Sequence, residues 1–163
     1  MYILGINAYH GGASACLIKD GEIVAAAEEE RFERIKYWAG FPVHAISFCL
    51  SEADISVHDL DHIGISRDPN ANIVRKAAYA IRRGPTPKLI LDRLRNRQVV
   101  GNIASVLCNY MKVNRRDIKA DFHNVEHHRA HLASAFFVSP YEHAAVMSID
   151  GMGDFTSTMW GYG

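Results

Sequence analysis

Apolar and polar positions in the first third of the chain predict strands followed by a helix. The expected strands are residues 2–7, two within 13–30, and 61–66. The two strands within 13–30 are joined at Asp20-Gly21, because Asp-Gly between apolar runs is a strong hairpin signal. Pro42 fits the first turn of a helix over 43–54, where apolar residues recur at helical spacing.

The remaining residues predict mostly helices and then two more strands. The expected elements are helices within 71–113, broken at 84–87 and near 101, a strand at 120–125, a helix over 127–138, and strands over 143–150 and 155–162. The glycine-rich stretch 151–153 is expected to form the turn between the last two strands, since glycine is a frequent turn residue.

The order of these elements predicts an α/β fold. Three strands, a helix, a strand and further helices follow one another as in a ribonuclease-H-like lobe of the actin, hexokinase and Hsp70 superfamily, an analogy of fold that assigns no reaction. We predict this lobe over 1–143 and the first strands of a second lobe over 144–163. Because so short a segment cannot complete a lobe, we expect the first part of a longer protein or half of a split one. Unpaired strands there favour a homodimer.

Composition narrows the class of protein. The chain has 163 residues, 48% hydrophobic and 22% charged, with 18 basic and 18 acidic side chains, which is ordinary globular composition. No apolar run approaches the roughly 20 residues of a membrane helix, and the first residues lack the basic start of a signal peptide. Three separated cysteines, Cys16, Cys49 and Cys108, suggest no disulfide framework. We therefore expect a cytoplasmic protein without a membrane partner.

The charges are unevenly distributed along the chain. Residues 67–119 hold 13 basic and 3 acidic side chains, between two acidic flanks. Such a segment can bind phosphate backbones, or it can be a solvated helix face that pairs with an acidic neighbouring domain. Few aromatic residues interleave these charges, so we favour the second interpretation and do not expect a nucleic-acid partner.

The sequence HHRAH offers candidate metal ligands. His127 and His131 are four residues apart, so on a helix they share one face, and neutral imidazole binds Fe, Zn, Ni or Cu. His128 would point about 100° away from them, given the helical repeat. Spacing alone leaves two interpretations open, a metal site or an ordinary polar helix face, and it favours the second.

A second candidate, SIDGMGDFTS, places an acidic residue at a strand end. Asp150 is a possible cation ligand, and Gly151 and Gly153 would let backbone N–H groups approach a phosphate. A plain hairpin explains the same residues equally well, because Asp and Gly are turn residues. We interpret Asp154 as a turn or surface residue.

The opening loop is the third candidate. Asn7, His10, Gly11 and Gly12 form a polar, glycine-bearing hairpin, which in a nucleotide-binding lobe faces the phosphates. The acidic run at 28–30 precedes three cations, and it fits either an anionic substrate or a cluster of surface ion pairs, which contribute only about 0–1 kcal/mol each.

Four sequence motifs resemble those of the O-carbamoyltransferases of the nodulation, cephamycin and tobramycin group. In chain order they are GINxxH, EEERFxRIKxxxGFPxxAIxxCL, VEHHRAHLASAFF and SIDGxGD. The resemblance covers the whole chain and implies that it is the first part of a protein several times longer. It implies that a carboxy-terminal domain makes carbamoyl adenylate from carbamoyl phosphate and ATP. The actin-like domain would transfer the carbamoyl group to the hydroxyl of a small-molecule acceptor.

The same resemblance implies site residues. Fe(II), or alternatively Zn, would be bound by His127, His131 and Asp150, with a further acidic ligand from outside this chain. His10 would contact the acceptor hydroxyl or the carbamoyl group. The chain departs from the pattern at Gly11, where many relatives have an acidic residue, so the resemblance implies no role for a carboxylate at this position.

Two alternatives remain. The tRNA threonylcarbamoyladenosine-modification family shares the HxxxH pair and actin-like lobes, and the basic segment 67–119 would suit tRNA. The run EEERFERIKYWAGFP resembles the O-carbamoyltransferases more. The other alternative is a folded lobe without catalysis of its own. We expect the 163 residues alone to be inactive even though the parent is an enzyme.

Overall fold

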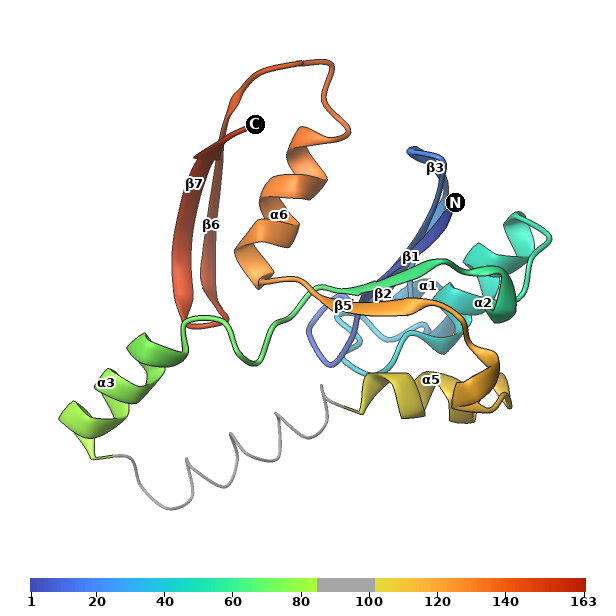
Figure 1. The fold of residues 1–163 in the computed structure, drawn as a ribbon, viewed down its shortest axis with the longest axis horizontal. Helices are drawn as coiled ribbons and strands as arrows, with labels where there is room; N and C mark the ends of the chain where they lie inside the picture. Colours follow the sequence, from blue (N-terminus) through green and yellow to red (C-terminus); the bar gives the residue numbers. More distant parts are fainter. Residues whose placement is uncertain (85–101) are drawn as a thin grey trace. The chain divides into compact units, whose positions relative to one another are not determined.

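The computed structural model describes residues 1–84 and 102–163, which form two compact units (Figure 1). The first unit comprises Met1–Ser66 and Asn102–Asn124. The second comprises Arg67–Gly101, described as far as residue 84, and Val125–Gly163. The predicted breaks at 85–87 and near 101 lie outside the described residues, as do four of the 13 basic residues of the segment 67–119, Lys88, Arg93, Arg95 and Arg97.

A five-stranded mixed sheet forms the centre of the first unit. Its strands, in the order β3-β2-β1-β4-β5, are β1 (Tyr2–Asn7), β2 (Ser14–Lys19), β3 (Glu22–Glu28), β4 (His62–Ile65) and β5 (Asp121–Asn124). β1, β2 and β3 are antiparallel neighbours, whereas β4 and β5 run parallel to β1. Asp20 and Gly21 both have positive φ, as the tight turn of a two-residue hairpin requires. The predicted strands and hairpin are confirmed.

Helices bury the apolar side of this sheet. They are α1 (Glu30–Glu33), α2 (Val43–Glu52) and α5 (Ile103–Met111), with 3-10 turns η1 (Val57–Asp59) and η2 (Arg115–Asp117). α2 packs against β2 and β3, and the core includes Leu4, Leu17, Ile46, Ile63 and Leu107. Each such buried side chain contributes roughly 1.5–3 kcal/mol to folding.

The second unit contains two helices and a two-stranded sheet. Its elements are α3 (Ile73–Arg83), α6 (His127–Phe136), β6 (Ala145–Gly153) and β7 (Thr156–Tyr162). β6 and β7 are antiparallel, and α6 packs against both of them (Figure 1). α3 ends where predicted, because Gly84 adopts a left-handed conformation as its C-cap.

The turn between β6 and β7 differs from the prediction. β6 continues through Gly151 to Gly153, with an irregular register after Ile149, and the turn is formed by Asp154 and Phe155. Both turn residues have positive φ, 46° and 68°. Left-handed residues at both central positions match the twist of a two-residue hairpin, so this turn forms without glycine.

The structure confirms a mixed α/β protein. The helices predicted over 43–54 and 127–138 are present but end two residues earlier, at Glu52 and Phe136. The ribonuclease-H-like lobe and the boundary between 143 and 144 stay predictions. In the part of the chain that the structure describes, no helix is long and apolar enough to cross a membrane.

Candidate metal centre

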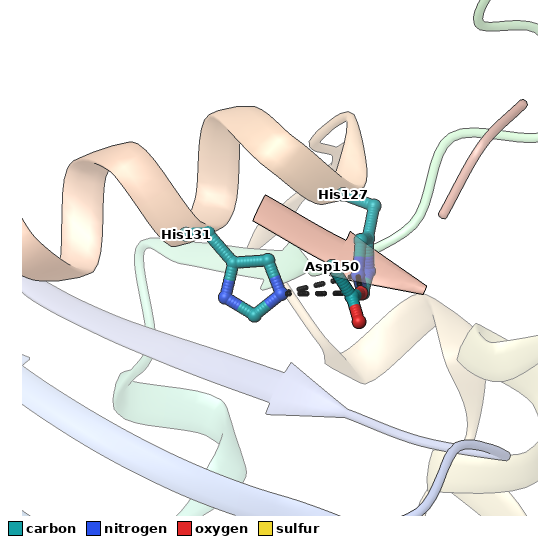
Figure 2. Close-up of side chains that lie close together, drawn as sticks. All are labelled: His127, His131 and Asp150. Carbon is teal, nitrogen blue, oxygen red and sulfur yellow. Dashed lines mark hydrogen bonds and ion pairs between the residues drawn. The ribbon is translucent and has the colours of Figure 1, made fainter. Parts of the chain in front are cut away.

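Three side chains of the second unit converge on one point (Figure 2). His127 Nε2 lies 2.7 Å from Asp150 Oδ2 and 3.1 Å from His131 Nε2. His131 Nε2 lies 3.8 Å from the same carboxylate oxygen. These three donor atoms all lie within 4.8 Å of one another, which is the spacing that one metal ion requires of its ligands.

Local structure explains this convergence. Glu126 begins α6, because its carboxylate accepts the N–H of Arg129 as an N-cap. His127 and His131 then follow one helical turn apart and share a face. Ser148 and Asp150, two residues apart in β6, both form hydrogen bonds with histidines of α6, so this strand face meets the helix.

His128 lies beside the cluster but does not join it. It is fully buried, and its ring contacts the hydroxyl of Ser148 at 2.9 Å and the carbonyl oxygen of Thr156 at 2.9 Å. As its position on the helix predicts, this ring faces a different direction from those of His127 and His131. It ties α6 to both strands of the hairpin.

The cluster is partly open to solvent and includes an ionised carboxylate. The side chain of His127 is 10% exposed, that of Asp150 36% and that of His131 50%. A hydrogen bond from His127 lowers the pKa of Asp150, and the N–H of Gly151 lowers it further. The carboxylate is therefore ionised at neutral pH and ready to bind a cation.

The donor set fits Fe(II) or Zn(II). Two imidazole nitrogens and one carboxylate oxygen are ligands that both ions accept. Three protein donors leave coordination positions for water, substrate or a further ligand. The short contacts between these side chains are those that an ion would replace.

Comparison with known proteins places the chain in a family. A family model described as "Carbamoyltransferase N-terminus" matches residues 2–162. The chain belongs to the carbamoyltransferase N-terminus family. This agrees with the resemblance carried by the four sequence motifs.

Several proteins are similar to this carbamoyltransferase N-terminus. An uncharacterized protein of Synechocystis sp. is 36% identical over 98% of the chain and 27% of its own length. The nodulation protein NolNO of Sinorhizobium fredii is 32% identical over 94% of the chain and 21% of its own length. The chain thus spans about a quarter of the length of these relatives. YeaZ from Pseudomonas aeruginosa, a solved structure, is 16% identical over 99% of the chain and 58% of its own length, with a TM-score of 0.45, too low to decide the fold.

The opening loop of this carbamoyltransferase N-terminus belongs to the first unit. His10 and Gly11 are exposed in the connection between β1 and β2. The amide of Asn7 donates to the carbonyl of Gly12 at 3.0 Å and accepts from the hydroxyl of Ser66 at 3.0 Å. Asn7 therefore braces the loop, while the predicted roles of these residues toward phosphate and acceptor stay predictions.

The two glycines of β6 have different surroundings. Gly151 is exposed, and its N–H donates to Asp150, whereas Gly153 is buried. Whether either N–H meets a phosphate stays a prediction.

Sequence reasoning missed the contacts of Asp154. Its Oδ2 accepts the backbone N–H of His127 at 3.0 Å and that of Asp68 at 2.8 Å. An acidic residue in a turn gives no sign of this in the sequence, because the partners are distant in the chain and depend on how α6 packs.

Glu29, from the acidic run at 28–30, lies in a second group of possible donors together with Glu33 and His44. Glu29 is 1% exposed, and its carboxylate accepts the N–H groups of His44 and Ala45 at the start of α2 as well as a 2.7 Å contact from the His44 ring. Both oxygens of this carboxylate therefore already accept hydrogen bonds from α2. We therefore interpret Glu29 as a cap for α2.

Proposed function

We propose that this chain is the amino-terminal, metal-binding part of an enzyme that transfers a carbamoyl group to the hydroxyl of a small molecule. The carbamoyl donor would be carbamoyl adenylate, made from carbamoyl phosphate and ATP by a part of the parent protein outside this chain. The convergence of His127, His131 and Asp150, in a chain that belongs to the carbamoyltransferase N-terminus family, carries the proposal.

The reaction defines what the site must do. A bond forms between the acceptor oxygen and the carbamoyl carbon, the bond from that carbon to the adenylate oxygen breaks, and AMP leaves. A base must take the hydroxyl proton, and His10 is our candidate for this role or for a direct contact with the carbamoyl group. Bound Fe(II) or Zn(II) supplies Lewis acidity toward the carbonyl or phosphate oxygens.

The residues on this chain suit such a site. His127, His131 and Asp150 would hold the ion, and the ionised carboxylate would balance part of its charge. The half-exposed side chain of His131 leaves one side of the cluster accessible to a substrate. The 163 residues alone are proposed to lack transferase activity, because the adenylate-forming part and a further ligand would lie elsewhere in the parent.

Metal content tests the first part of this proposal. The complete parent protein is loaded anaerobically with Fe(II) or Zn(II), dialysed, and its ions per chain counted by elemental analysis, with His127→Ala as the control. We expect one ion that the variant loses. An ion retained by His127→Ala would place the metal elsewhere, and no ion in either protein would refute a metal centre at this cluster.

The role of His10 is tested in the same parent protein. His10→Ala is expected to lower carbamoyl transfer while pyrophosphate release from ATP, which reports adenylate formation, continues. Both steps are followed in one reaction mixture. Equal loss of the two steps would exclude a role for His10 in transfer.

A further inference from the structure

Gly153 lies directly beneath a ligand of the candidate metal centre. A Cβ atom at Gly153 would lie 1.9 Å from Cδ2 and 2.2 Å from Cγ of the His127 ring. Both distances are shorter than the 3.0 Å below which real Cβ atoms essentially never approach another atom. We propose that Gly153 and Asp154 form a seat that positions His127 for metal binding, an inference that rests on the proposed function. In this seat Gly153 makes room for the ring and Asp154 holds the backbone.

The missing side chain at Gly153 is needed for space and not for backbone conformation. Gly153 has no positive φ, and the two residues of the following turn that do have one, Asp154 and Phe155, are not glycines. Any residue could adopt the backbone of β6 at this position. The ring of His127 is therefore what restricts position 153 to glycine.

Asp154 fixes the other end of the same ligand. Its Oδ2 accepts the N–H of His127, the first residue of α6, at 3.0 Å and the N–H of Asp68 at 2.8 Å. Its own carbonyl oxygen accepts from the Asn72 amide at 3.0 Å. The turn is thus anchored to the segment before α3, and the start of α6 is anchored to the turn.

A displaced ring would lose the metal geometry. His127 Nε2 lies 2.7 Å from Asp150, and a methyl group at position 153 must push the ring away from its present place. Groups that orient metal ligands typically change metal affinity by about 10- to 100-fold when they are altered. We expect a loss of this size for Gly153→Ala.

The experiment compares Gly153→Ala with Gly161→Ala in the complete parent protein. Gly161 lies in β7, and a Cβ there would meet only Leu132 Cδ1, at an ordinary 4.0 Å. Titration with Zn(II) gives the dissociation constant of each protein. Gly153→Ala is expected to weaken binding by about 10- to 100-fold, whereas Gly161→Ala should bind as the unaltered protein does. Equal affinities in all three proteins would overturn the proposal.

A measurement without metal separates this inference from the proposed function. Diethyl pyrocarbonate modifies accessible histidines, and mass spectrometry follows each site. In the unaltered protein His127 should react more slowly than the half-exposed His131, and in Gly153→Ala its rate should approach that of His131. If the modification rate of His127 is the same in Gly153→Ala as in the unaltered protein, the proposed positioning role of Gly153 is overturned, even if no metal binds. Failure of zinc binding in the unaltered protein, with the rate changed as expected, would refute only the metal function.

Fully buried His128 reports whether the variant is folded, because it stays unmodified only while α6 remains packed. If Gly153→Ala unfolds, the Asp154 variants decide. Asp154→Asn keeps an oxygen acceptor for the N–H of His127, and Asp154→Ala removes it. We expect Asp154→Asn to keep both zinc affinity and slow modification of His127, and Asp154→Ala to lose both. The same values in the two variants would contradict an anchoring role.

Discussion

His128 shows how one buried residue can determine a helix position. Its Nε2 faces the carbonyl oxygen of Thr156, which can only accept, so Nε2 carries the proton and Nδ1 accepts from the Ser148 hydroxyl. Both ring nitrogens therefore have hydrogen-bond partners at full burial. Because these partners belong to β7 and β6, the ring sets the rotation of α6 and hence the direction of the neighbouring ligands.

We predict that His128→Ala destabilises the protein by about 2–4 kcal/mol, since it leaves a cavity and two unpaired polar groups. Urea unfolding of both proteins measures this change. His143→Ala, at an exposed position, serves as the control and should change stability by less than about 0.5 kcal/mol. A similar small change for His128→Ala would mean that α6 does not depend on these bonds.

At the scale of elements, the start of α2 depends on a residue outside the helix. Glu29, between β3 and α1, accepts the N–H groups of His44 and Ala45, while the N-cap residue of α2, Pro42, provides no side-chain acceptor. First-turn N–H groups have no partner within their own helix. The buried carboxylate therefore joins the end of β3 to the beginning of α2.

Glu29→Ala is predicted to lower the free energy of unfolding by about 2–4 kcal/mol, because it removes a charged acceptor from buried donors. The neighbouring Glu28→Ala is the matched control, since Glu28 is exposed and should change stability by less than about 0.5 kcal/mol. Thermal unfolding of the two variants side by side gives the comparison. Equal stabilities would show that α2 begins without this cap.

The elements themselves could be predicted because their signals are local. Alternating and helical spacing gave the strands and helices, and Asp20-Gly21 gave the first hairpin. The second turn was predicted wrongly at 151–153, because glycines there suggested a turn, whereas Gly153 accommodates a ring from a distant helix. Its environment depends on tertiary packing, which spacing along the chain does not report.

The candidate site was only partly visible in the sequence. Helical spacing placed His127 and His131 on one face, and the strand end marked Asp150 as a possible cation ligand. Nothing local linked the three, and their grouping in one site came from the family resemblance. Asp154 was interpreted as an ordinary turn residue for the same reason. Its partners, the N–H groups of His127 and Asp68, are identified only once α6 and the hairpin are packed.

At the scale of the whole molecule, the β6–β7 hairpin exposes an apolar face. Met147 pairs with Trp160 and Ala145 with Tyr162, and the side chains of Met147, Ile149, Trp160 and Tyr162 are 64–77% exposed. A contiguous group of large, exposed apolar side chains is typical of surfaces that bind another protein. This observation supports the expectation of self-association, which stays a prediction.

We predict that the 163-residue chain self-associates through this face and that Trp160→Ser shifts the equilibrium toward monomer. Sedimentation velocity at several concentrations measures the distribution. Tyr141→Ser is the control, because Tyr141 is also exposed but lies outside the hairpin. An unchanged distribution in Trp160→Ser would assign any association to another surface.

The three donors that this chain contributes to the candidate centre come from residues 127–150, within one compact unit. The chain segment between the first and the last of these donors is short, so bringing them together costs little loop-closure entropy. The three donors can therefore meet before more distant parts of the sequence have folded. In proteins as long as the relatives, of which this chain spans 27% and 21%, the segment leaves the ribosome long before synthesis ends. If the cluster binds metal as proposed, we expect a nascent chain to acquire its ion during translation, so that metal supply at the ribosome would affect how much metal-loaded protein a cell makes.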